Sequence, residues 1–134
     1  MPPTFVRALA GAALACTLLG PLPAKARVIE FTCTVVMEGS GSSSQRRVRI
    51  DTDALTASDN EMTYTHGGAS PYASNVEQFV NVSAGRITWG SRVRDTGAGA
   101  GMFSIDTLTG HYAFSSRFRG LLGQGTCHNG SGAI

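Results

Sequence analysis

The segment Met102–Phe118 constrains the fold most, because apolar and polar residues alternate on both sides of one turn. The alternating apolar residues are Phe103 and Ile105 before the turn and Tyr112, Phe114 and Phe118 after it. Within the turn, the carboxylate of Asp106 can accept local hydrogen bonds, and Gly110 can adopt the positive φ that closes a bulged hairpin. This pattern predicts an antiparallel β-hairpin that contributes Phe103, Ile105, Tyr112 and Phe114 to a core.

Segments rich in β-branched and aromatic residues predict further strands at 28–37, 45–51, 61–65, 76–82, 86–89 and 124–128. In the fourth of these, Phe79 points away from the face that carries the valines. Residues 51–60 are expected to form a polar connection with one helical turn, and residues 90–101 a loop. About eight short strands predict an all-β domain, an antiparallel meander closed or nearly closed into a small barrel, with a two-sheet sandwich as the alternative. Its core is expected to contain Trp89, Tyr112 and Phe114.

Residues 1–26 have the pattern of a cleaved signal peptide, with a basic start, an apolar run and the small-x-small sequence Ala24-Lys25-Ala26. The apolar run is shorter than the ~20 residues of a membrane-spanning helix. An uncleaved anchor and lipid attachment at Cys16 are the alternatives. We therefore expect a periplasmic or secreted protein with a single domain over residues 27–134.

Net charge limits the classes of partner. Of the 11 Lys and Arg residues, Arg7 and Lys25 lie in the leader, and the other nine balance the nine Asp and Glu residues. A mature chain without excess positive charge is not suited to binding nucleic acid or an anionic membrane. We expect no nucleic-acid partner, no membrane contact after cleavage, and a monomer.

Two cysteines remain in the mature chain, Cys33 near its start and Cys127 near its end. In an oxidising compartment such a pair is expected to form a disulfide. The bond would hold the first strand beside the last and so cover both edges of the sheet. The alternative, a pair of reactive or metal-binding thiols, lacks neighbouring ligands at a suitable spacing.

The sequence contains no motif that predicts catalysis, a cofactor or a metal ion. The histidines are isolated and are expected to be solvated turn residues: His66, His111 and His128. The acids at 51, 53, 59 and 106 lie in predicted turns, where Asp accepts local hydrogen bonds. No serine lies in a strand-to-helix nucleophile turn. We therefore predict a protein that is not an enzyme.

Several arginines alternate with inward-facing residues and are expected to cover a solvated face or rim. If they cluster, they form a candidate anion-binding face, for which the sequence suggests Arg47, Arg49, Arg92 and Arg94.

Short motifs run through most of the mature chain: Phe31-Thr32-Cys33, Ile87-Thr88-Trp89, the Ile105–Gly110 hairpin and Gly125-Thr126-Cys127. In these motifs the chain resembles a group of small exported bacterial β-proteins of unknown function, which implies export and a β fold. The chain also begins its first strand with an aromatic-x-Cys sequence, and Gly68-Ala69-Ser70-Pro71-Tyr72 is similar to the inhibitory loop of periplasmic lysozyme inhibitors, small disulfide-bonded barrels. That similarity implies a candidate binding loop with Ser70 and Tyr72.

These observations predict an exported, non-enzymatic binding or interaction module for a protein or small-ligand partner. The alternatives are a periplasmic inhibitor of a lysozyme-like hydrolase and a small secreted enzyme whose site is assembled from distant loops.

Overall fold

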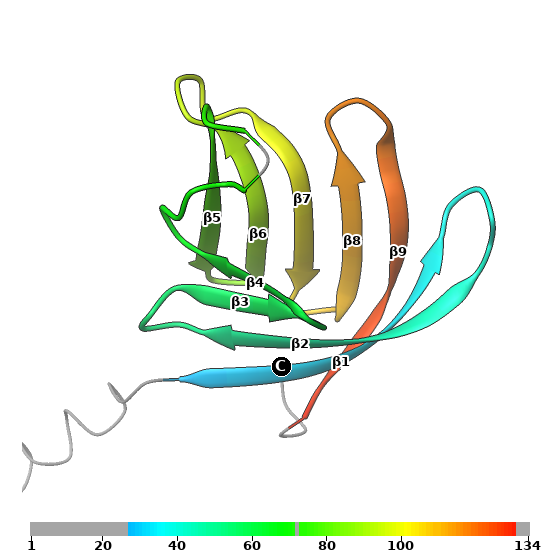
Figure 1. Ribbon diagram of the computed structural model, residues 1–134. Helices are drawn as coiled ribbons and strands as arrows, with labels where there is room; N and C mark the ends of the chain where they lie inside the picture. Colours follow the sequence, from blue (N-terminus) through cyan, green and yellow to red (C-terminus); the bar gives the residue numbers. More distant parts are fainter. Residues whose placement is uncertain (1–26, 72, 131–134) are drawn as a thin grey trace, which may run out of the picture.

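The computed structural model describes residues 27–71 and 73–130, so the predicted signal peptide and Tyr72 lie outside the described residues. The described chain forms nine antiparallel strands in one sheet, bent into a nearly closed barrel (Figure 1). The prediction of an all-β barrel is confirmed, and the strands do not divide into the two sheets of a sandwich. The strands are β1 (Val28–Met37), β2 (Ser43–Asp51), β3 (Thr56–Asp59), β4 (Met62–Thr65), β5 (Val76–Ser83), β6 (Arg86–Val93), β7 (Gly99–Asp106), β8 (His111–Ser116) and β9 (Gly120–Asn129).

Two meanders make up the sheet, β1 to β4 and β5 to β9, and the pairing of β1 with β9 joins them. Cys33 and Cys127 are directly opposite each other in this pairing and form the predicted disulfide. The first strand therefore lies beside the last, as expected. The sheet edges, however, are β4 and β5, so the expectation that the disulfide covers both edges is wrong. The reason is that both strands joined by the disulfide are interior strands, because β1 also pairs with β2 and β9 also pairs with β8.

The seam between β4 and β5 is closed by the loop that connects them. The Gly67 N–H donates to the Gln78 carbonyl at 2.9 Å, and the Gln78 N–H donates to the Gly68 carbonyl at 2.7 Å. Two side chains complete the seam. The Gln78 Oε1 accepts from the Thr65 N–H at 3.0 Å, and the His66 Nδ1 accepts from the Val80 N–H at 3.1 Å. Side chains thus satisfy main-chain donors that a strand ladder would otherwise bind.

The core is built across neighbouring strands by aromatic rings on the inner face of the sheet. Trp89, Phe103 and Phe114 follow one another on β6, β7 and β8, with ring centroids 5.6 and 4.4 Å apart and nearly parallel planes. Trp89 and Tyr112 are fully buried, and Phe114 packs partly buried against them, so the predicted core role of all three is confirmed. The Trp89 indole N–H finds no acceptor among the described residues, and its burial therefore depends on ring packing.

The predicted hairpin forms as expected at its turn, where the Asp106 carboxylate accepts from the Leu108 and Thr109 N–H groups and Gly110 has a φ of 80°. Its second strand ends earlier than predicted. β8 stops at Ser116, and Phe118 lies in the next turn with 86% of its surface exposed. Phe118, the last residue of the alternating pattern, therefore lies outside the core.

Residues 51–60 contain an additional strand in place of the predicted polar connection. β3 pairs with β2 and β4 although Ala57 is its only apolar residue. The expected helical turn before it is a non-helical turn in which Leu55 has a φ of 53°. The loop predicted at 90–101 is shorter, because β6 continues to Val93 and β7 begins at Gly99. Across the two described ranges, no helix is long and apolar enough to span a membrane.

Candidate functional site

One end of the barrel gathers three connections that the sequence places far apart. They are the β8–β9 turn at 117–119, the β6–β7 turn at 94–98 and the described residues 70–71 and 73–75 of the loop before β5. The Arg117 N–H donates to the Ala100 carbonyl at 3.0 Å, and the Arg94 N–H donates to the Asn75 carbonyl at 2.8 Å. The first bond joins the β8–β9 turn to the start of β7, and the second joins the β6–β7 turn to the residue before β5. All three connections lie at the top of Figure 1. We call these three connections the hairpin end.

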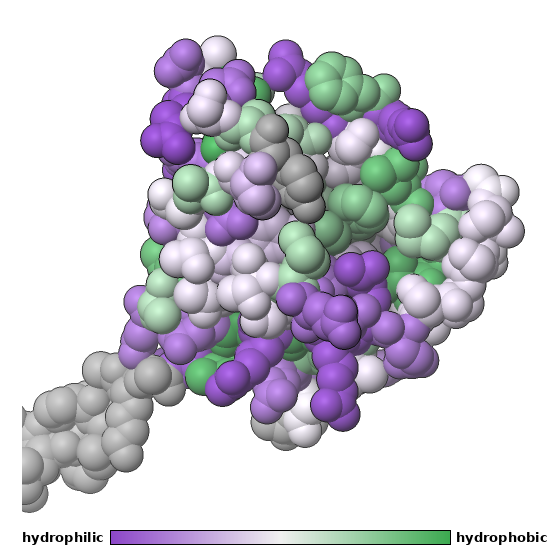
Figure 2. Space-filling view, viewed as in Figure 1, coloured by the Kyte–Doolittle hydropathy of each residue, from purple (hydrophilic) through white to green (hydrophobic). Residues whose placement is uncertain are grey.

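The β8–β9 turn carries an exposed aromatic residue between two cations. Phe118 is 86% exposed, and its ring is contacted by the Arg117 guanidinium at 5.8 Å from the ring centroid. Within the described chain, the side chains of Arg117, Arg119 and Arg94 form no ion pair. Figure 2 shows hydrophobic atoms bordered by strongly hydrophilic ones at this end of the molecule. The surface therefore combines exposed apolar area with unpaired positive charge.

The candidate binding loop belongs partly to this end. Ser70 is half-buried, and its N–H donates to the Val76 carbonyl at 3.3 Å, where the loop joins β5. Its predicted partner Tyr72 lies outside the described residues. The structure thus places Ser70 near the β6–β7 turn, and the shared binding role of the two residues stays a prediction.

The four predicted arginines occupy three places. Arg47 and Arg49 project from the outer face of β2 and line a hollow of about 390 Å³. Arg92, on β6, pairs with Glu77 at 2.8 Å. Arg94 is exposed in the β6–β7 turn. Only Arg94 lies at the hairpin end, where it is joined by two arginines that sequence analysis did not select.

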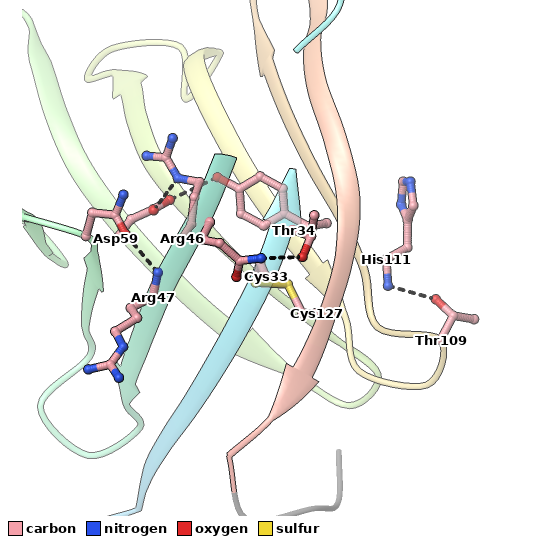
Figure 3. Close-up of a disulfide and its surroundings, with 11 residues drawn as sticks. Cys33, Thr34, Arg46, Arg47, Asp59, Thr109, His111 and Cys127 are labelled. Atoms are coloured by element: carbon pink, nitrogen blue, oxygen red, sulfur yellow. Dashed lines mark hydrogen bonds and ion pairs between the residues drawn. A yellow bond between two sulfur atoms is a disulfide. The ribbon is translucent and has the colours of Figure 1, made fainter. Parts of the chain in front are cut away.

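A buried polar network crosses the barrel interior beside the disulfide (Figure 3). Asp59 is 1% exposed and accepts from the Arg46 Nε–H at 2.6 Å and from the Tyr112 O–H at 3.0 Å. The expectation that Asp59 is a turn acid is wrong, because it pairs in register with the buried Val48 and so faces inward. Arg46 also lies on the inner face, opposite Cys33.

This network is suited to holding the barrel together rather than to proton transfer. Burial and the charge of Asp59 raise the pKa of Tyr112 well above its ordinary value, so the phenol stays protonated. The Asp59 carboxylate is held by a donor on each oxygen. The Tyr112 hydroxyl group therefore links β8 to β3 across the interior, and the protonated phenol is not available as a general base at neutral pH.

The histidines do not converge. His66 belongs to the β4–β5 seam, His111 lies 3.2 Å from the Gln124 side chain, and His128 is exposed on β9. Over residues 27–71 and 73–130, no three metal-ligating side chains come together.

Comparisons with known proteins identify no relative: no family model, curated protein or solved structure matches this sequence. The features that bear on function are therefore the exposed hairpin end and the pockets of the barrel wall.

Proposed function

We propose that this chain is an exported, non-enzymatic binding module that binds a protein partner through the hairpin end. The observation that carries the proposal is Phe118, which is 86% exposed between Arg117 and Arg119. Aromatic residues and arginine dominate the binding energy of protein interfaces when a partner buries them. A large exposed ring at the tip of a hairpin contributes nothing to the barrel core, and its apolar surface is available to a partner.

The chemistry of this end defines the partner. The tip offers an exposed apolar ring between Arg117 and Arg119, which form no ion pair within the described chain. A concave surface with an apolar pocket and acidic rim complements it in shape and charge. Export is supported by the leader pattern of residues 1–26 and by the Cys33–Cys127 disulfide, which is compatible with an oxidising compartment.

A second candidate is inhibition of a lysozyme-like hydrolase. The loop with Ser70 adjoins the β6–β7 turn, so the candidate inhibitory loop and the cationic tip are presented at the same end. Glycoside hydrolases carry a pair of carboxyl groups in a substrate cleft. An exposed, cationic tip complements such a cleft in charge and would exclude substrate from it.

Affinity capture from an envelope extract tests the main proposal when matched variants are compared. Phe118→Ser removes the exposed ring at the hairpin end, and Leu108→Ser removes an equally exposed residue, 87%, from the β7–β8 turn. We expect a protein that is retained by the wild type and by Leu108→Ser but lost with Phe118→Ser. Retention that is indifferent to Phe118→Ser would contradict the proposal.

The inhibitor candidate has a separate test. The mature protein is added to a lysozyme assay on cell walls, and the lysis rate is measured with the wild type and with Phe118→Ser. Slower lysis with the wild type alone supports inhibition through the hairpin end. An unchanged rate with excess wild-type protein excludes that lysozyme as the target.

A further inference from the structure

The outer wall of the barrel contains a pocket with an unusual floor. It measures about 400 Å³ and lies over β5, β6 and β7, away from the barrel interior. Phe79 forms its floor and is only 7% exposed, although it points outward from the sheet. Arg92 covers this ring, with its guanidinium 5.7 Å from the ring centroid, and Met102 lines the same pocket. The result is a small site with an apolar floor and polar walls, on a face that a single-layer barrel would ordinarily leave polar.

The polar groups around this floor include two donors held in place, on Arg92 and His66, beside Asn81 and Thr88, whose side chains can donate or accept. Arg92 is fixed because its Nε and Nη2 both bind the same Glu77 oxygen, at 2.9 and 2.8 Å, which leaves Nη1 for a ligand. His66 accepts the Val80 N–H through Nδ1, so the hydrogen of the neutral imidazole is on Nε2. Thr88 adds a hydroxyl group to the lining. A ligand for this site therefore needs acceptor atoms at one end and an apolar body at the other.

We propose that this pocket binds a small organic anion, a carboxylate attached to an apolar ring. The ring would lie against Phe79 and Met102, and the carboxylate would accept hydrogen bonds from Arg92 and its polar neighbours. A pocket of this size that combines an apolar surface with fixed polar groups can hold a small ligand in one orientation. Because Glu77 already neutralises much of the Arg92 charge, we expect an affinity in the millimolar range. The site adjoins the hairpin end at Gly97, but it contains neither Phe118 nor the arginines beside it, so it does not depend on the proposed protein partner.

Three probes separate the ring from the charge. Benzoate carries both, benzamide is its neutral counterpart, and acetate keeps the carboxylate without the ring. Each is titrated into ¹⁵N-labelled protein while the main-chain amide signals of Phe79, Thr88 and Arg92 are followed by NMR. We expect saturable shifts with benzoate and roughly tenfold weaker binding of benzamide and acetate, one lost interaction each. Equal binding of benzoate and benzamide, equal binding of benzoate and acetate, or no shift with benzoate would overturn the proposal.

Matched variants locate the binding. Arg92→Gln is expected to weaken benzoate binding at least about fivefold, as loss of a charge-assisted contact. Arg86→Gln alters an exposed arginine on the same face of the same strand, outside the pocket, and should leave binding unchanged. If Arg92→Gln does not fold, Met102→Ser tests the apolar contact from β7 without disturbing the Glu77 ion pair. Benzoate binding that is unaffected by the folded pocket variants would refute the assignment.

Discussion

Replacing Tyr112 by phenylalanine tests the buried network that crosses the barrel. The variant keeps the ring, which packs near Trp89 and Phe103 at centroid distances of 6.3 and 6.5 Å, and removes only the hydroxyl group. Asp59 then loses the donor to its Oδ2 atom while 1% exposed, with Arg46 as its remaining side-chain partner. A hydrogen bond to a charged group contributes about 1.5–3 kcal/mol. We expect the free energy of unfolding to fall by that amount at pH 7.

The same variant makes a prediction about alkaline pH. An unfolded tyrosine loses its proton near pH 10, whereas the raised pKa of Tyr112 keeps the folded phenol protonated. This contribution to stability is therefore complete below about pH 10 and declines as the pH rises above it, by about 1.4 kcal/mol per pH unit. Tyr112→Phe lacks the titrating group and should lack that part of the decline. All other tyrosines are common to both proteins, so their difference isolates Tyr112.

Urea denaturation followed by fluorescence measures both effects, because Trp89 is the only tryptophan and lies in the core beside Tyr112. Asp59→Asn and the double variant complete a double-mutant cycle that isolates the Tyr112–Asp59 interaction from the loss of either group alone. A Tyr112→Phe protein within about 0.5 kcal/mol of the wild type would refute the claim that the bond is stabilising. Equal slopes above pH 10 would refute the pKa argument.

Three further perturbations test the closure of the barrel and its best-formed turn. Cys33 and Cys127 should resist thiol labelling until reduction, and reduction should lower the free energy of unfolding by about 4–5 kcal/mol, given a sequence separation of 94 residues. In β9, a Cβ at Gly125 would collide with the main chain of β1, so we expect Gly125→Ala to cost about 3 kcal/mol or more in thermal or urea unfolding. Gly123→Ala, whose Cβ would meet a flexible methionine sulfur at 3.0 Å, should be much milder. The backbone N–H groups that bind Asp106 lower the pKa of its carboxyl, so its NMR titration midpoint should lie below the ordinary aspartate value, and its stabilising effect should decline as the pH falls through that midpoint.

Local alternation of apolar and polar residues was sufficient to predict most strands. It did not predict β3, which forms because it pairs with neighbouring strands. The hairpin around Asp106 follows from period-two patterning and turn chemistry, and both are local properties. β3 has Ala57 as its only apolar residue, and its strand conformation depends on pairing with β2. Because that pairing is not visible in the segment itself, Asp59 was assigned to a turn and the network with Tyr112 was missed. The seam between β4 and β5 is likewise a property of the whole sheet.

The two candidate sites, around Phe118 and Phe79, could not be predicted from the sequence for a different reason. Alternation continues past Ser116 as far as Phe118, but the register between β8 and β9 shifts at Phe114 and Ser115, and the strand ends before the last aromatic residue. Phe79 was correctly placed opposite the valines, yet its burial depends on Arg92 from the next strand. Exposure of one ring and burial of the other are set by neighbours that sequence spacing does not identify.

Stability and the proposed binding functions are located on different surfaces of this barrel. The disulfide, the Tyr112 network and the aromatic stack all lie on the inner face. Loss of any of them should lower the free energy of unfolding, whichever surface binds a partner. Phe118 is 86% exposed, and its replacement should change the free energy of unfolding by less than about 0.5 kcal/mol. A Phe118→Ser protein that loses its partner but unfolds like the wild type would therefore identify a contact surface. Arg92 contributes to both stability and ligand binding, because it covers Phe79 and also lines the pocket. The ligand test therefore needs a second pocket variant that remains folded.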